Sequence, residues 1–467
     1  MIRKVLFGEE FIISLILLFG SFYLHAQIPS KSDTDFAKLP APTIKDISVA
    51  GNNFNSGMQE YGYIPVFDRN PSEHNTFTVF TRSTYSTLYI FAPNGEPLYY
   101  KSLNNYGYDF KLLPDNTLSY FDQERVGYVI MDEYFNEIDF IEAKNGFETD
   151  FHEFFYHDNA YFLLAKDTRD IDMSTIVEGG KEDAKVIGIV IQKIDKEHNL
   201  VFEWNSFEYF EIKDSYGKLK VQTVDPFHIN SIEMDTDSTI LISTRNLNEI
   251  TKINLNNGEI IWRMGGENNE FEFIGFDRPF AGQHTLNKRE GQLYTLFDNG
   301  LEQEPEYSRG LIIEINEEQR QVKLIKEFRH SPDIYSRIVG NIQNLDNGNF
   351  LIYWGINTGL EVDGSFTVYD EDYNLIEEAK LLNTLAYRVY KFNWRPKNFS
   401  TDEEVLVFPD TEIGDTTLTE LNLRNNTGKS IVIDELIWKN ESFQLNTSNP
   451  VTILPGNDYP LPIRFSP

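Results

Sequence analysis

One pattern recurs along most of this chain: an apolar run, a short turn rich in Asn, Asp, Gly or Pro, and a second apolar run. Residues 111–118, 253–262 and 345–352 are clear copies of it. Turn-forming residues between two β-rich runs predict hairpins, and we expect about eleven of them between residues 85 and 395. Since two hairpins make one four-stranded blade, the pattern predicts a β-propeller of about six blades over residues 85–397.

Length and composition agree with this architecture. A chain of 467 residues is too long for one ordinary core, and it suits a large repeat domain followed by a smaller one. The 36 Phe and 25 Tyr favour strands, and no long stretch has a helical period. The sequence therefore predicts an all-β protein, in which radial closure leaves few exposed strand edges.

The repeat ends near residue 398. Strand-like runs follow at 403–408, 416–422, 431–438 and 461–465, with a polar, turn-rich stretch at 439–449. This spacing predicts a small Ig-like β-sandwich over residues 398–467. Its pattern resembles the accessory Ig-like domains of the ASPM/Hydin type, and we expect the sandwich to be incomplete at Pro467.

The first residues read as a secretion signal. A short basic start is followed by an apolar run over 11–23 and by Ala26, a small residue suited to cleavage. We expect residues 1–26 to be a signal peptide and residues 27–84 to form the N-terminal lead-in and the first propeller strands. We expect the protein to be exported to the periplasm, the cell surface or the medium. The alternative is an uncleaved anchor. After cleavage no membrane span is expected, since the run is shorter than about 20 residues.

Charge and cysteine content narrow the function classes. The net charge of -32 predicts a surface that repels nucleic acid and anionic membranes. An anionic ligand would then need a locally basic site. The chain has no cysteine, which excludes disulfides, thiolate metal sites and cysteine nucleophiles.

The hairpins that open successive blades can be aligned, and a polar residue stands at the same point of each. These residues are Asp109, His152, His228, His284, Asn341 and Arg388. Equivalent positions of successive blades lie on one ring around the propeller axis. Three of the chain's eight histidines fall at this point, and a ring of His, Asn and Arg offers N–H donors and positive charge to an anion.

Two other readings of this ring stay open. A histidine at a strand start is often a hydrogen-bonded structural residue. Three histidines also suit zinc, although the ring adds only Asp109 as a carboxylate. We expect neither a metal nor a cofactor.

The same segments carry a family resemblance. The stretch contains His-Ile-Asn-Ser at 228–231, Ser-Thr-Arg at 243–245 and Gly-Glu-Ile-Ile-Trp-Arg-Met-Gly-Gly at 258–266. Gln-His at 283–284, Phe-Asp-Asn-Gly at 297–300, Ser-Arg-Gly at 308–310 and Gly-Asn-Ile-Gln at 340–343 follow. This ordered set resembles the arylsulfotransferases and covers most of residues 85–395.

The resemblance implies a six-bladed propeller that moves a sulfuryl group from a phenolic sulfate ester to a phenol, without a nucleotide donor. The implied partners are a small aryl sulfate and a phenol, not nucleic acid. His228, His284 and Arg309 match residues that hold the sulfate in the family, and they are our expected catalytic residues. From the ring and its neighbourhood, the expected substrate-binding residues are His152, Asn230, Asn341 and Arg388. The alternative is a non-catalytic propeller that binds an anionic or carbohydrate ligand at the central funnel.

One departure from the family matters. Its well-studied bacterial enzymes carry the sulfuryl group on a later histidine, whereas the last histidine here, His330, lies in a loop-like sequence. We therefore expect His284 to attack the sulfur, with His228 and Arg309 holding the oxygens and all of them meeting in one funnel. Direct transfer between two bound phenols, with no covalent step, is the other route.

Overall fold

The structure is a computed structural model. It describes residues 62–68, 77–80, 87–91, 97–356, 364–382, 386–394, 399–401, 408, 414–425, 431–433, 443–445, 451–454 and 456–466. The expected signal peptide (1–26) lies outside the described residues, as does much of the expected lead-in (27–84). The chain divides into two compact units, a larger one of residues 55–131 and 137–395 and a smaller one of residues 1–54, 132–136 and 396–467.

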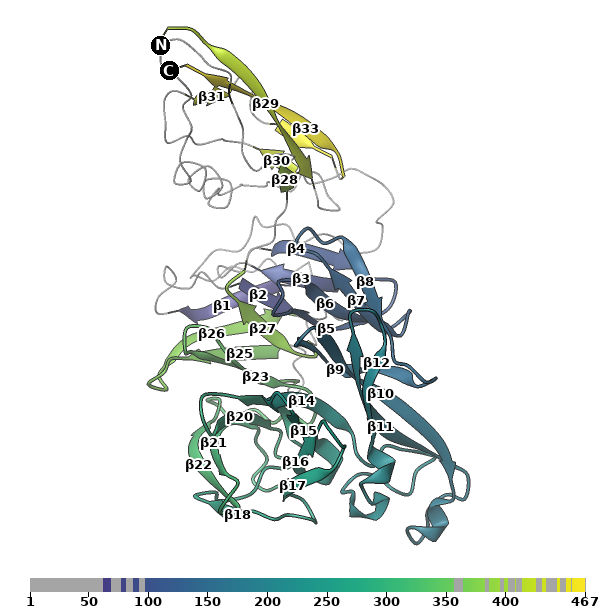
Figure 1. Ribbon diagram of the computed structural model, residues 1–467. Helices are drawn as coiled ribbons and strands as arrows, with labels where there is room; N and C mark the ends of the chain where they lie inside the picture. The colour runs from purple at the N-terminus through teal and green to yellow at the C-terminus, as the bar shows by residue number, and fades with distance from the viewer. Residues whose placement is uncertain are drawn as a thin grey trace, which may run out of the picture. The chain divides into compact units, whose positions relative to one another are not determined.

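The larger unit is built from antiparallel sheets that follow one another along the chain (Figure 1). Five of these sheets each contain four consecutive strands. The first comprises β5 (Gly107–Leu112), β6 (Leu118–Asp122), β7 (Gly127–Met131) and β8 (Glu137–Ile141). The second comprises β9 (Glu148–His157), β10 (Ala160–Ile171), β11 (Ala184–Asp195) and β12 (Leu200–Asn205). The third comprises β14 (Ile229–Thr236), β15 (Thr239–Thr244), β16 (Glu249–Asn254) and β17 (Ile260–Gly265). The fourth comprises β19 (His284–Lys288), β20 (Leu293–Asp298), β21 (Arg309–Asn316) and β22 (Gln321–Phe328). The fifth comprises β23 (Asn341–Asn344), β24 (Phe350–Tyr353), β25 (Gly364–Tyr369) and β26 (Leu375–Leu382).

A further sheet is composite, because it joins strands from both ends of the unit. In it, β27 (Val389–Phe392) pairs with β2 (Phe77–Phe80), which is followed by β3 (Thr87–Phe91) and β4 (Pro97–Ser102). The predictions of an all-β protein and of a propeller are confirmed. Five blades are each made of consecutive strands. The predicted count of six would require the composite sheet to be counted as a sixth blade.

Short extra strands extend three of the sheets. They are β1 (Gly62–Asp68) on β26, β13 (Thr223–Val224) on β11 and β18 (Glu272–Ile274) on β22. The hydrophobic cores lie between successive sheets. Phe162 and Trp204 of the second sheet pack with Ile232 of the third, while Leu241 of the third packs with Leu296 of the fourth. This packing fixes each inner strand relative to the next.

Helix is almost absent from the described residues. The helical turns are short 3₁₀ segments: η2 (Met173–Thr175), η3 (Ser206–Glu208), η4 (Ile212–Asp214) and η5 (Arg245–Leu247). Within the described ranges, no helix has the length and apolar character needed to cross a membrane.

The smaller unit is also made of strands. One sheet has the order β28 (Phe399–Thr401), β29 (Thr417–Asn425), β33 (Asp458–Phe465) and β31 (Phe443–Leu445). A second sheet pairs β30 (Ile431–Ile433) with β32 (Val451–Ile453). Alternate residues of β29 and β33 are buried, among them Leu421, Leu423, Leu461 and Ile463. Two sheets, with alternate burial along β29, β33 and β32, agree with a β-protein here, and an Ig-like topology stays a prediction.

Candidate active site

The polar residues aligned in the sequence occupy the same place in the larger unit. Asp109, His152, His284 and Asn341 lie in β5, β9, β19 and β23, which are edge strands of their sheets. His228 and Arg388 directly precede β14 and β27, the corresponding edge strands of the other two sheets. The alignment therefore places one polar residue at the edge strand of every sheet in the unit.

The backbone is irregular at or beside several of these residues. The pairing register shifts between Tyr108 and Lys111, and between Ile229 and Ser231. Asp109 (φ 51°), His228 (φ 53°) and Thr285 (φ 52°) adopt left-handed backbone conformations at or beside the ring. Bulges of this kind re-aim a side chain and are common next to active sites.

A buried carboxylate holds His152. The Nδ1 atom lies 2.5 Å from an oxygen of Asp150, which also accepts the backbone N–H of His152 at 2.9 Å. Burial would raise the pKa of the Asp150 carboxyl, but the charge and hydrogen bonds of His152, together with Lys166, lower it to about 2. Asp150 is therefore a carboxylate at neutral pH. With Nδ1 committed to it, His152 directs Nε2 away from the backbone.

His228 has the same kind of partner. Its Nδ1 lies 2.6 Å from Asp225, whose other oxygen accepts the backbone N–H of His228 at 3.0 Å. Burial lowers the pKa of His228 despite the opposing effect of Asp225, so the imidazole is neutral at pH 7. A neutral ring that donates from Nδ1 carries its lone pair on Nε2, the atom suited to attack or to take a proton.

The two carboxylate-held histidines are neighbours. Their ring centroids are 4.7 Å apart, and the rings meet edge to face. Tyr387 lies against His152, with centroids 5.8 Å apart, and donates its hydroxyl hydrogen to the backbone oxygen of that residue. The ring of His284 packs against the same tyrosine at 5.7 Å. Tyr387 thus contacts both His152 and His284, while His228 contacts His152.

The third histidine differs in its environment. His284 is only 2% exposed, and its Nδ1 has no hydrogen-bond partner among the described residues. Burial, together with the charges of Arg388 and the nearby histidines, lowers its pKa well below the ordinary value. The side chain of His228 is 25% exposed and that of His152 12%. His228 is therefore the most accessible of the three, and His284 the least.

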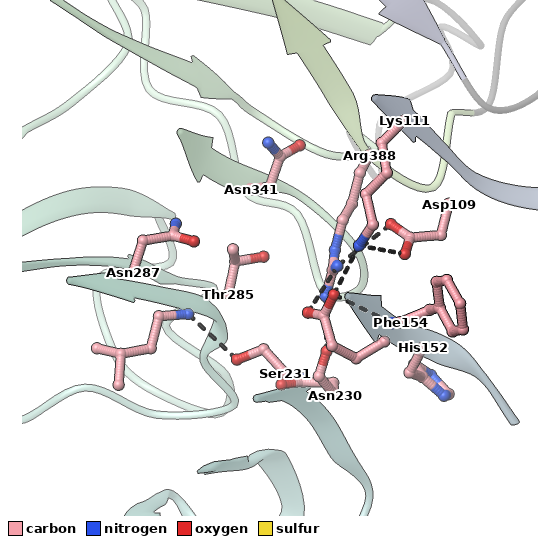
Figure 2. A network of polar contacts seen from close by, with 12 residues as sticks. Asp109, Lys111, His152, Phe154, Asn230, Ser231, Thr285, Asn287, Asn341 and Arg388 are labelled. Atoms are coloured by element: carbon pink, nitrogen blue, oxygen red, sulfur yellow. Dashed lines mark hydrogen bonds and ion pairs between the residues drawn. The ribbon is translucent and has the colours of Figure 1, made fainter. Parts of the chain in front are cut away.

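A buried network of charges lies beside His152 (Figure 2). Lys111 pairs with Asp109 at 2.6 Å and with Glu153 at 2.8 Å. Arg388 bonds Glu153 at 2.9 Å and Asp109 at 3.3 Å, and the Tyr390 hydroxyl donates to Asp109 at 2.8 Å. Two cations and two carboxylates balance here, so the network fixes strands rather than offering a free charge to a ligand.

Two expected substrate-binding amides serve as links between strands. Asn341 donates to the backbone oxygen of Val389 and accepts its N–H, at 2.8 and 2.9 Å. Asn230 donates to the backbone oxygen of Gln283, and its own backbone oxygen accepts from Arg388. These bonds tie neighbouring inner strands together and use one of the two N–H donors of each side-chain amide.

Arg309 is placed apart from the expected role. It is fully buried, and it pairs with Asp298 at 2.8 Å and with Glu327 at 2.7 Å. Its remaining bonds go to the backbone oxygens of Arg278 and Pro279. Since these donors are taken up by the protein's own oxygens, we do not retain Arg309 as a sulfate ligand. In the described part of the chain, no group of three or more His, Cys, Asp or Glu could hold a metal ion.

Sequence reasoning missed the groups that orient the histidines. Asp150 stands two residues before His152, and Asp225 stands three residues before His228. An Asp at such spacing is visible in the sequence and could have been noticed. No sequence signal pointed to Tyr387 as the contact shared by His152 and His284.

Comparison with known proteins identifies the family of this chain. The family model described as Arylsulfotransferase (ASST) matches residues 107–375, more than half of the chain. The chain belongs to the arylsulfotransferase family. The matched range holds all three histidines of this arylsulfotransferase family member, together with both carboxylates that orient them. No curated protein sequence matches it.

Solved structures resemble the chain only distantly. A protein of unknown function from Bacteroides caccae is 9% identical with a TM-score of 0.46, covering 68% of this chain and 98% of that one. TolB from Acinetobacter baumannii is 11% identical with a TM-score of 0.40, covering 68% and 66%. An inactive virginiamycin B lyase from Staphylococcus aureus, solved with quinupristin, is 9% identical with a TM-score of 0.37, covering 69% and 99%. At this similarity they carry no argument about function.

Proposed function

We propose that this chain transfers a sulfuryl group from an aryl sulfate ester to a phenolic acceptor. The observation that carries the proposal is the pair His152 and His228, each held at Nδ1 by a carboxylate, with rings 4.7 Å apart. Two oriented imidazoles side by side can divide the chemistry, one acting on sulfur and the other moving the proton. Family membership supports the choice of a sulfate ester as the donor.

In the first half of the reaction, His228 is the nucleophile. Its Nε2 lone pair forms a bond to sulfur while the bond between sulfur and the aryl oxygen breaks. The departing phenolate takes a proton from His152, which the Asp150 carboxylate orients through Nδ1. The phenol product leaves, and the sulfuryl group stays on His228.

In the second half, the acceptor phenol gives its proton to His152 while its oxygen bonds to sulfur. The bond between His228 and sulfur breaks and its electron pair returns to Nε2, so both residues recover their starting states. His284, uncharged and deeply placed, supplies an N–H donor to a sulfuryl oxygen. No cofactor takes part in these steps.

The geometry favours His228 over His284 as the nucleophile, although the sequence led us to expect the reverse. His284 lacks an orienting carboxylate, and 98% of its surface is covered. His330, the last histidine of the chain, contacts Trp354 and lies 3.5 Å from Glu378. Those contacts are with residues of, or next to, the strands of the fifth blade.

The test uses a chromogenic aryl sulfate with and without added phenol. We expect phenol-dependent release of the chromophore by the full chain, and its loss in His228→Gln. The matched control is His198→Gln, since His198 is an exposed histidine that also pairs with a carboxylate, Asp139. That variant should react like the unmodified protein.

A second measurement separates the two routes. Incubation with donor alone, followed by digestion at neutral to alkaline pH, should give a peptide containing His228 that is about 80 Da heavier, the mass of SO₃. Transfer without a modified histidine would support direct displacement between two bound phenols. If aryl sulfates give neither transfer nor modification, the alternative of a non-catalytic propeller that binds an anionic or carbohydrate ligand replaces the enzyme proposal.

Three further proposals concern the setting of this chemistry. The composite sheet acts as the sixth blade, because β27 pairs with β2 and so joins the ends of the unit. The smaller unit is an Ig-like sandwich, as its two sheets suggest. The protein is exported, and its mature form begins at or near Gln27. Sequencing the N-terminus of secreted material tests the last point, and an intact Met1 in the membrane fraction would point to an anchor instead.

A further inference from the structure

Arg245 stands beside the histidines although no expectation singled it out as a site residue. It follows the last residue of β15, Thr244, which pairs with Ile229 at the start of β14. Its backbone N–H donates to the backbone oxygen of His228 at 3.0 Å. Arg245 and His228 are therefore cross-strand neighbours at the same end of the third sheet.

The guanidinium of Arg245 is held by neutral groups. One terminal nitrogen donates to the side-chain oxygen of Asn246 at 2.8 Å, and the other donates to the backbone oxygen of Arg337 at 2.9 Å. Asn246 is in turn fixed, because it donates to the backbone oxygen of Asp225 at 2.7 Å. Two of the five N–H groups are used in this way, which orients the planar group and leaves N–H donors for a ligand.

No ion pair neutralises this cation among the described residues. The other buried arginines contrast with it, since Arg309 pairs with two carboxylates and Arg388 belongs to the balanced network. Burial lowers the pKa of Arg245 despite the opposing charge of Asp225, with which it forms no ion pair, and the charge of Arg245 contributes to lowering the pKa of both His228 and His284. The charge of Arg245 thus acts on the histidine cluster itself.

Other charged groups near the histidines are either paired or exposed to water. Asp150 is bound by His152 and lies 3.7 Å from Lys166, which also pairs with Glu148. Arg337 is exposed, so water screens its charge. Arg245 is one partly buried cation whose guanidinium bonds no carboxylate, next to the neutral imidazoles of His228 and His284. This arrangement matches a ligand that carries a single negative charge.

We propose that Arg245 binds a non-bridging oxygen of the sulfuryl group, and that its single charge selects monoanionic sulfate or sulfonate groups over phosphate dianions. The choice of sulfuryl rests on the proposed function; the selection of a monoanion rests on the charges alone. A dianion would place its second charge beside the carboxylates of Asp150 and Asp225, with no second unpaired cation to meet it.

The test measures binding without turnover. Calorimetric titration of the full chain at pH 8 compares benzenesulfonate, a monoanion, with phenyl phosphate, which is largely a dianion above a second pKa of about 6. We expect benzenesulfonate to bind at least about tenfold more tightly. Arg245→Gln should weaken benzenesulfonate binding by about 10- to 100-fold. Arg245→Lys should weaken it less, because lysine keeps the positive charge but lacks the planar set of N–H donors of the guanidinium.

Arg329→Gln is the matched control, because Arg329 is an exposed arginine paired with Asp333. It should bind benzenesulfonate like the unmodified protein. Unchanged binding in Arg245→Gln, equal affinity for the two ligands, or no benzenesulfonate binding at all would overturn the inference. The two proposals fail separately. Selective binding without transfer would remove only the transferase, while transfer by Arg245→Gln with an unchanged KM would remove only the role of Arg245.

Discussion

Replacing Asp150 by asparagine removes the carboxylate that holds His152, and the structure sets the size of the effect. Asp150 is 1% exposed, and its pKa falls from 3.8 to about 2 in the folded protein. A carboxylate with a lower pKa in the folded state stabilises the fold above the unfolded pKa, and loses this contribution as the pH falls through the folded value. The difference corresponds to about 2 kcal/mol in the free energy of unfolding at pH 7.

Urea unfolding of the wild type and Asp150→Asn at pH 7, 4 and 3 measures this contribution. We expect the difference in stability to be nearly complete at pH 7 and 4, and to fall to roughly half by pH 3. Asp139→Asn is the control, because Asp139 pairs with the exposed His198 and such pairs contribute about 1 kcal/mol or less. The reasoning is refuted if the difference is the same at pH 3 as at pH 7, or if both variants lose equal stability.

Three other outcomes are expected. Arg309→Met should lower the free energy of unfolding by about 3–5 kcal/mol, because it leaves the buried Asp298 carboxylate without its partner cation. The folded protein should keep its KM for an aryl sulfate, and a raised KM would restore Arg309 to the site. Gly340→Ala should lower the free energy of unfolding by more than about 2 kcal/mol, since φ is 97° and the added Cβ would lie 2.3 Å from the Phe297 ring. In the control Gly291→Ala, where φ is 63° and no atom lies near the added Cβ, the loss measured by thermal unfolding should be about 1 kcal/mol. Asp225→Asn should lower kcat/KM about tenfold, through loss of a charge-assisted hydrogen bond at a carboxylate that is one-third exposed; an unchanged value would remove the nucleophile assignment.

The hairpin pattern was enough to predict the propeller, because turn residues between β-rich runs are local signals. The composite sheet was beyond such reasoning. Pairing of Phe77–Phe80 with Val389–Phe392 joins segments about 310 residues apart, and no local preference encodes a contact at that separation. The count of blades therefore depended on one pairing that the sequence does not mark.

The candidate site, like the fold, could be predicted from the sequence only in part. The repeat position predicted that His152, His228 and His284 belong together, and their contacts through Tyr387 agree with this. The surroundings of the arginines could not be predicted in the same way, because they depend on which carboxylates lie nearby in space. Sequence placed Arg309 at the sulfate, yet its neighbours neutralise it, whereas Arg245 has only neutral acceptors.

The late position of Arg388 has a consequence for how the protein is made. This residue bonds Glu153 and the backbone of Asn230, and it directly precedes the strand that pairs with β2. A nascent chain emerging from the ribosome lacks it until residues 1–387 have been synthesised. Until then Lys111, Asp109 and Glu153 carry an unbalanced negative charge in the middle of the unit. The histidines thus reach their final arrangement only after the last inner strand arrives, and truncated products that end before it should be inert rather than partly active.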